Sequence, residues 1–198
     1  MNGKRIGFVL LMLGLVILPA NYTGAGELTG TVSAAGMRHH GDAVVYIDAI
    51  PGESFPPPEQ HVVVDQIGMT FEPHVLPVVL GTTVDFLNSD AFLHNVFTPD
   101  KCAEKFNLGS WPKGQVRSYT FSQPCNAVLL CQVHPEMEAF IVVTLTPYFA
   151  VTDRSGAFKI EGVPDGTYTV KVWHPKLKEI SQEVIVAGDT ELDLQLNK

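Results

Sequence analysis

Short runs that alternate apolar and polar residues dominate this chain. Val84–Asn88, Thr167–Trp173 and Glu191–Leu196 all alternate in this way. A period of two is the pattern of a β-strand with one buried face. Between Pro58 and Pro147 no convincing amphipathic helix pattern occurs. The chain is therefore predicted to be all-β.

The predicted strands are short and separated by turn residues, as in β-sandwiches and barrels. In chain order they span Leu28–Val32, Ala43–Asp48, His61–Val64, Val78–Leu80, Val84–Asn88, Val116–Phe121, Ala127–Leu130, Ala139–Leu145, Val151–Phe158 (strand, turn, strand), Thr167–Trp173, Ile180–Val186 and Glu191–Leu196. Ser89–Leu93 is predicted to be a loop that leads into His94–Phe97. The stretch Thr98–Gly114 is expected to be long and irregular.

A proline-rich stretch divides the pattern. The prolines of Pro51–Pro58 cannot sit inside a sheet, so this stretch is predicted to be a boundary. We expect an export signal (1–25), the first strands of one sandwich (26–55), a second sandwich (56–146) and the remainder of the first (147–198). The second sandwich would then be inserted in the first, which is tolerable where the host strands' ends lie close together. The alternative is an N-terminal arm followed by a separate sandwich.

The N-terminus has the pattern of an export signal. Lys4 and Arg5 precede the apolar run Ile6–Leu18, and small residues follow it. The run is shorter than the roughly 20 residues that a membrane span needs. Leu18-Pro19-Ala20 is an imperfect cleavage sequence, so an uncleaved anchor is the alternative. A periplasmic or extracellular protein without a membrane span after cleavage is expected.

The charge balance bears on the choice of partner. Thirteen basic and twenty-one acidic side chains give a formal charge of −8. A mildly acidic surface argues against nucleic acid and favours basic or neutral proteins as partners.

The strongest chemical pattern lies directly after the predicted strand Ala127–Leu130. Cys131, His134 and Met137 follow one another at intervals of three residues. Thiolate, imidazole and thioether suit copper, and a His2Cys set with a weak axial Met is typical of a mononuclear blue-copper electron-transfer site. The second imidazole is predicted to be His94, which only a folded sheet could bring close.

These four ligands would fill every coordination position. A closed site leaves no position for a substrate, unlike a catalytic metal, so we expect an electron carrier and not an enzyme. A dinuclear site would need a second cysteine on the loop, and the methionine disfavours zinc. Ordinary explanations account for single residues: Cys131 in a disulfide, Met137 in the core, His134 at the surface. They do not account for the common spacing.

The stretches Val84–Asn88 and His94–Phe97, joined to the cysteine–histidine–methionine motif, resemble the cupredoxin family over roughly Pro58–Thr146. The short cysteine-to-methionine spacing is more similar to amicyanin than to plastocyanin. The resemblance implies a Greek-key β-sandwich that holds one type 1 copper and carries single electrons. It also implies redox protein partners, such as a c-type cytochrome or a dehydrogenase. Asn95 would hydrogen-bond the ligand loop, and His134 would be the electron exit.

The same residues admit other functions. In a copper-delivery or copper-storage protein the ion, and not the electron, would be the cargo. A non-redox adhesion or assembly module with a vestigial site is a third hypothesis. Reversible one-electron cycling with copper retained would support the carrier, and ready transfer of Cu(I) to an acceptor would support delivery.

Three cysteines occur in the chain. An odd count in an exported protein leaves one thiol with another use. If Cys131 binds metal, Cys102 and Cys125 remain as a pair, although spacing alone does not establish their bond.

The other histidines form no motif of comparable strength. His39 and His40 form a pair in a turn that could capture loose metal, but a solvated loop is the preferred interpretation. His61, His74 and His174 lack partners in the sequence and are expected at the surface.

The C-terminal stretches Thr152–Phe158 and Val163–Tyr168 are similar to carboxypeptidase-regulatory-like β-sandwich domains. Such domains begin with a Gly-x-Val strand, which Gly30-Thr31-Val32 fits. Nothing in this part looks catalytic, so it is expected to be a scaffold or docking module.

Overall fold

The computed structural model describes residues 24–198, so the predicted signal sequence lies almost entirely outside the described residues. Residues 24–198 form strands β1–β17 and one short 3₁₀ helix, η1 (Lys101–Ala103), without an α-helix, which confirms the all-β prediction. No helix within this range is long and apolar enough to cross a membrane.

Strands from both ends of the chain form one sandwich, here called the outer sandwich. Its first sheet has the order β13-β1-β16, with β17 also paired to β1, and its second sheet has the order β12-β2-β14-β15. The strands are β1 (Ala25–Ala34), β2 (Val44–Ile47), β12 (Phe149–Val151), β13 (Ala157–Pro164), β14 (Gly166–His174), β15 (Leu177–Val186), β16 (Thr190–Glu191) and β17 (Leu194–Leu196).

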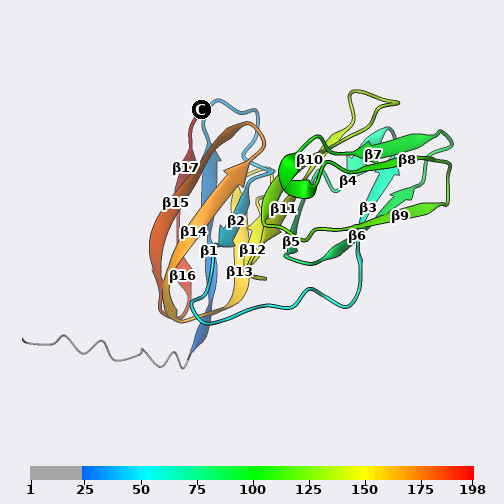
Figure 1. Cartoon of the computed structure of the whole chain (residues 1–198). Coiled ribbons are helices and arrows are strands. Elements are labelled where there is room, and N and C mark those ends of the chain that lie inside the picture. The colour runs from blue at the N-terminus through cyan, green and yellow to red at the C-terminus, as the bar shows by residue number, and fades with distance from the viewer. Residues whose placement is uncertain (1–23) are drawn as a thin grey trace, which may run out of the picture.

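The strands between β2 and β12 form the inserted sandwich. Its sheets have the orders β4-β3-β6-β9 and β5-β11-β10-β7-β8. The strands are β3 (Val62–Ile67), β4 (Thr70–Glu72), β5 (Val75–Val79), β6 (Thr83–Asn88), β7 (His94–Phe97), β8 (Asn107–Trp111), β9 (Val116–Thr120), β10 (Cys125–Leu130) and β11 (Glu138–Thr144). Figure 1 shows the two sandwiches as separate lobes, with η1 and the β10–β11 loop in the inserted one.

The chain leaves and re-enters the outer sandwich at one point. β2 pairs antiparallel with β12, with Tyr46 opposite Phe149, and the Ile47 amide donates to the Tyr148 carbonyl at 3.0 Å. β1 pairs with β13, β16 and β17. The outer sandwich is therefore split, as one hypothesis required, and the separate N-terminal arm is wrong. The residue boundaries of the four segments stay a prediction.

Alternation along the strands places the apolar side chains in two main cores. β14 buries Tyr168, Val170 and Val172 in the outer core, and β6 buries Val84 and Phe86 in the inserted one. A third, smaller cluster of Val44, Tyr46, Val75 and Val142 lies where the two sandwiches meet. The sandwiches therefore pack directly on each other.

One expected loop contains a strand. Within Thr98–Gly114 the structure has β8 and η1, so the prediction of a wholly irregular stretch is wrong. β8 carries Gly109 at a positive φ of 73° and buries only Trp111 fully, so its sequence shows no clear alternation. Its extended conformation comes from pairing with β7, where Trp111 lies opposite His94.

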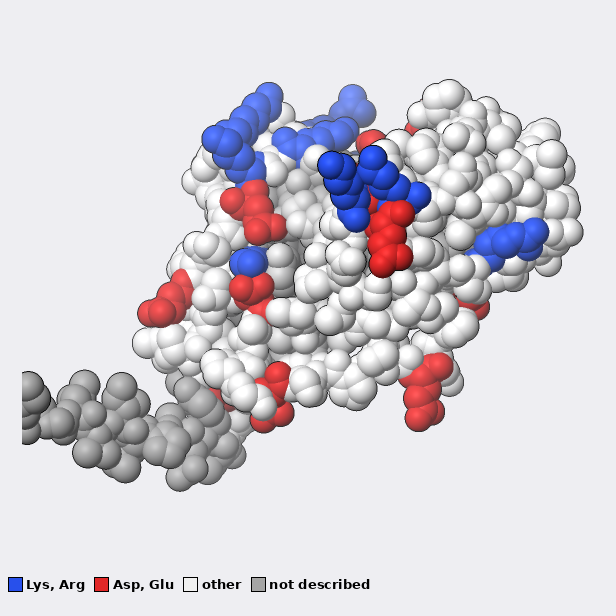
Figure 2. Space-filling model, viewed as in Figure 1, with Lys and Arg blue, Asp and Glu red and all other residues white. Residues whose placement is uncertain are grey.

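Charged side chains are unevenly spread on the face in view. Most of the lysine, arginine and acidic side chains in Figure 2 lie on the outer sandwich or at the boundary between the two. The inserted sandwich is largely uncharged on this face.

A substitution at Gly30 tests whether β1 lies close to the C-terminal strands of the outer sandwich. A Cβ there would overlap the backbone carbonyl of Leu192, and the φ of 155° is one that side chains rarely adopt. Gly30→Ala is expected to lower the free energy of unfolding by about 1–3 kcal/mol, because β1 must move away from the C-terminal segment. Urea denaturation followed by circular dichroism measures the change.

Ile185→Ala is the control, since that side chain is 71% exposed and its loss should change stability by less than about 0.5 kcal/mol. Equal stability of Gly30→Ala and the parent protein would contradict the close approach of β1 to Leu192.

Candidate metal centre

A tight turn between two paired strands carries three of the predicted ligands. Leu130 at the end of β10 lies opposite Glu138 at the start of β11, so the residues between them form a short arch. The Met137 amide donates to the His134 carbonyl at 3.0 Å and closes this arch. Cys131, His134 and Met137 are therefore held on one small loop.

Sheet pairing brings in the fourth residue. β7 lies beside β10 in the same sheet, with Phe97 opposite Leu130, and His94 is the first residue of β7. His94, Cys131 and Met137 are exposed by only 0%, 3% and 1%, and His134 is half-buried. The sequence prediction that a folded sheet would unite these residues is confirmed for His94, Cys131 and His134.

The ligand-type atoms of three side chains converge. One nitrogen of His94, one of His134 and the Cys131 Sγ all lie within 4.8 Å of one another. The two Nδ1 atoms are 3.0 Å apart. Met137 lies in the same buried cluster as Cys131. Among the described residues this is the one His, Cys, Asp or Glu group that meets this spacing.

Hydrogen bonding selects the tautomer of His94. Its Nε2 is 2.8 Å from Asp90 Oδ2, and a carboxylate can only accept, so Nε2 carries the proton. The Nδ1 lone pair of His94 therefore points toward His134 Nδ1. Two imidazole nitrogens and a thiol within 4.8 Å of one another are a donor set that fits a cation of copper's softness.

Asn95 holds the ligand loop. Its side-chain oxygen accepts from the Gln132 amide at 3.2 Å, and its side-chain nitrogen donates to Asn107 Oδ1 at 2.9 Å and the Gly109 carbonyl at 2.8 Å. The predicted hydrogen bond to the loop is present. It ties the residue after Cys131 to β8, two strands away.

Asp90 is a residue of the site that sequence reasoning missed. Besides His94, its carboxylate accepts from the amides of Gly68 at 2.7 Å and Met69 at 2.9 Å. The Met69 amide is the largest cause that holds the pKa of Asp90 below its usual value; burial opposes it, and Gly68 and His94 add to the lowering. An acid four residues before a predicted ligand histidine was the available signal.

The cysteine pairing is resolved. Cys102 and Cys125 form a disulfide, and Cys131 is free and buried. The pairing left open by the sequence is therefore confirmed, and Cys131 has no disulfide partner.

One of the remaining histidines is not at the surface, where it was expected. His174 is 4% exposed, so its expected place at the surface is wrong, and burial lowers the pKa of its ring. It lines a cavity of about 70 Å³ with Met37, His39, Asp42 and His74, where His74 Nδ1 lies 3.1 Å from Asp42. The ligand atoms there do not converge as they do at Cys131.

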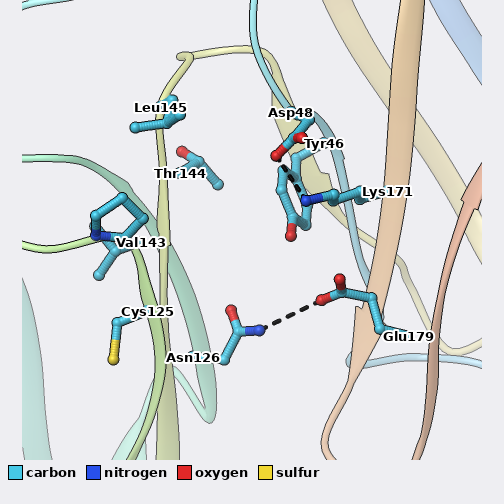
Figure 3. Close-up of a pocket in the computed structure, with 10 residues that line it drawn as sticks. Tyr46, Asp48, Cys125, Asn126, Val143, Thr144, Leu145, Lys171 and Glu179 are labelled. Carbon is cyan, nitrogen blue, oxygen red and sulfur yellow. Dashed lines mark hydrogen bonds and ion pairs between the residues drawn. The ribbon is translucent and has the colours of Figure 1, made fainter. Parts of the chain in front are cut away.

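A second cavity lies between the two sandwiches, away from the ligand loop. Its volume is about 210 Å³. Figure 3 shows the side chains that line it, among them Asp48 and Lys171. Lys171 is 2.9 Å from Asp48, and Asn126 of β10 donates to Glu179 of β15 at 3.4 Å. Burial, with the charge of Glu179, raises the pKa of Tyr46. These polar groups pair with one another, and the Asn126–Glu179 bond links the two sandwiches.

Comparison with known proteins gives likenesses to both parts of the chain. The model of a family described as polysaccharide lyase family 4, domain II, matches residues 143–193. This is not the carboxypeptidase-regulatory-like family, so that resemblance stays a prediction. No curated protein matches the chain.

Several solved structures are similar to about half of the chain. The Cu(I) form of an amicyanin mutant is 30% identical with a TM-score of 0.41, over 52% of this chain and 98% of that one. A Cu-containing nitrite reductase from Thermus scotoductus SA-01 is 29% identical with a TM-score of 0.41, over 49% of this chain and only 25% of that one. A purple cupredoxin from Nitrosopumilus maritimus is 20% identical with a TM-score of 0.39, over 42% and 99%. Likenesses of this degree do not by themselves assign a function to the chain.

The role of Asn95 can be tested without metal. Asn95→Ala removes three part-buried hydrogen bonds, which is expected to cost about 1–3 kcal/mol of stability. The Gln132 amide should then exchange faster with deuterium in the metal-free protein. Unchanged exchange at Gln132 would show that the loop is held by other contacts.

Proposed function

We propose that this chain is an exported, mononuclear type 1 copper protein that carries single electrons between redox proteins. The proposal rests on the convergence of one nitrogen of His94, one of His134 and the Cys131 Sγ within 4.8 Å, with Met137 in the same buried cluster as Cys131. The donor types match a blue-copper set. Copper held there would supply reversible one-electron exchange.

The surrounding residues suit electron transfer better than catalysis. Cys131, His94 and Met137 are buried, and protein side chains would provide all four ligands. The Asn95 bonds and the Met137–His134 turn fix the loop before any ion binds. A rigid ligand set changes little between oxidation states, which favours fast electron transfer. We therefore infer a carrier and not an enzyme.

The surface next to His134 supports an electron exit there. Phe92 and Leu93, which precede His94, are 59% and 53% exposed, and Val133, which precedes His134, is 46% exposed. These three side chains are called the apolar rim. Exposed apolar side chains next to the two ligand histidines suit brief contact with a redox partner, such as a c-type cytochrome or a dehydrogenase.

The visible and EPR spectra after Cu(II) loading test the function. An intense thiolate-to-copper band with narrow hyperfine splitting is expected, and Cys131→Ser should abolish it because the thiolate is lost. Reversible cyclic voltammetry with copper retained should accompany the band.

A colourless, tetragonal Cu(II) signal would overturn the type 1 assignment. A blue protein that hands Cu(I) readily to a chelating acceptor would instead favour copper delivery. Met37→Leu, which alters a thioether packed against the core of the outer sandwich, is the control and should leave the spectrum unchanged.

The apolar rim can be tested through electron self-exchange, which needs no known partner. Leu93→Glu should slow self-exchange by roughly tenfold, since a penalty of about 1.4 kcal/mol for bringing two charged rims together has that effect. NMR line broadening in mixtures of the two oxidation states measures the rate. Leu145→Glu, at a 41% exposed position away from the ligand loop, is the matched control. Equal slowing in both variants would contradict exit through the rim.

A further inference from the structure

One carboxylate connects the two sheets of the inserted sandwich at the ligand loop. Asp90 lies in the loop between β6 of one sheet and β7 of the other. Its Oδ2 contacts His94 Nε2 at 2.8 Å and the Met69 amide at 2.9 Å, and its Oδ1 accepts from the Gly68 amide at 2.7 Å. Both oxygens are therefore engaged, and the side chain is only 13% exposed.

The loop around Asp90 is fixed by a buried amide. Asn88 is 1% exposed, and its side-chain oxygen accepts from the Asp90 amide at 3.0 Å. Its side-chain nitrogen donates to the carbonyls of Phe92 and Trp111, both at 2.8 Å. The backbone on both sides of Asp90 is thereby held, so the carboxylate has little freedom to swing away from His94.

The turn between β3 and β4 has the backbone needed to meet this carboxylate. Gly68 and Met69 have φ values of 64° and 59°, in the left-handed region. For Met69, which is not glycine, this conformation is uncommon and costs energy that surrounding contacts must offset. Two successive N–H groups in such a turn can point at one anion. Met69 itself is 44% exposed.

We propose that Asp90 is a positioning residue that fixes the His94 imidazole and passes displacements of the exposed Gly68–Met69 turn to it. The inference rests on the proposed function, because its effect is read at the copper. A displacement of this turn would then change the position of the His94 ring through Asp90.

The direction of the effect follows from the hydrogen bond. A carboxylate that accepts from Nε2–H raises the basicity of the other ring nitrogen. A more basic Nδ1 favours Cu(II) over Cu(I). Removing the negative charge, with the side chain's size kept, should therefore shift the equilibrium toward Cu(I).

Asp90→Asn tests this effect, since asparagine can still accept from the turn through one oxygen. The Cu(II)/Cu(I) equilibrium is expected to shift about tenfold toward Cu(I), which is 59 mV for a one-electron couple. Asp85→Asn is a matched control, because Asp85 contacts His61 Nδ1 at 2.9 Å on the same sandwich without touching the site. Equal potentials for the two variants would overturn the proposal.

A double-mutant cycle tests transmission from the turn. A Cβ at Gly68 meets no atom within 4 Å, but it strains a turn with positive φ, so Gly68→Ala should displace the turn without a clash. We expect Gly68→Ala alone to shift the potential less than Asp90→Asn does. When it is added to Asp90→Asn, it should cause no further shift. Additive shifts in the two backgrounds would show that Asp90 does not connect the turn to the copper.

The metal-free protein separates this proposal from the proposed function. ¹⁵N NMR of the His94 ring should show the Nε2-protonated tautomer in the parent protein and its loss in Asp90→Asn. If copper gives no blue band while this tautomer persists, the proposed function fails and the Asp90–His94 contact stands. If the blue band forms but Asp90→Asn shifts neither tautomer nor potential, the Asp90 proposal alone is wrong.

Discussion

The pairing of β7 with β10 is the constraint on which the candidate metal centre depends. His94 is distant in sequence from the loop that carries Cys131 and His134, and this pairing places them at one end of one sheet. Asn95 adds a hydrogen bond from β7 to the loop, and Asp90 adds one from His94 to the opposite sheet. The backbone therefore gathers the donors, and buried polar side chains set their orientation.

The outer sandwich packs against the same sheet near its β5 edge, which is the edge opposite β8. In the order β5-β11-β10-β7-β8, β5 is an edge strand, and its Val75 packs with Val142 of β11 against Val44 and Tyr46 of β2. Unprotected edges favour unwanted strand pairing, and a packed neighbour is one way to limit access to them. The Asn126–Glu179 bond ties the sandwiches at a second place. The host sandwich is thus a support for the inserted one.

Local patterns were enough to predict some of this structure and not the rest. Alternation predicted β6 and β14, and ligand spacing predicted the Cys131 loop, because both are properties of neighbouring residues. β8 was missed, since its extended form depends on β7 and its own residues hardly alternate. His174 was placed at the surface because its burial follows from the packing of β14 against a distant loop.

Asp90 shows why donor spacing alone is an incomplete description of such a site. In sequence it is one acid in a short loop, and the Gly68–Met69 turn that holds it belongs to another hairpin. Only the folded sandwich brings the turn, the carboxylate and His94 into one chain of hydrogen bonds. The ligands determine which ion can bind, whereas this chain of contacts determines how strongly His94 donates to it. Tuning of the centre therefore depends on tertiary contacts between the two sheets, which ligand spacing does not encode.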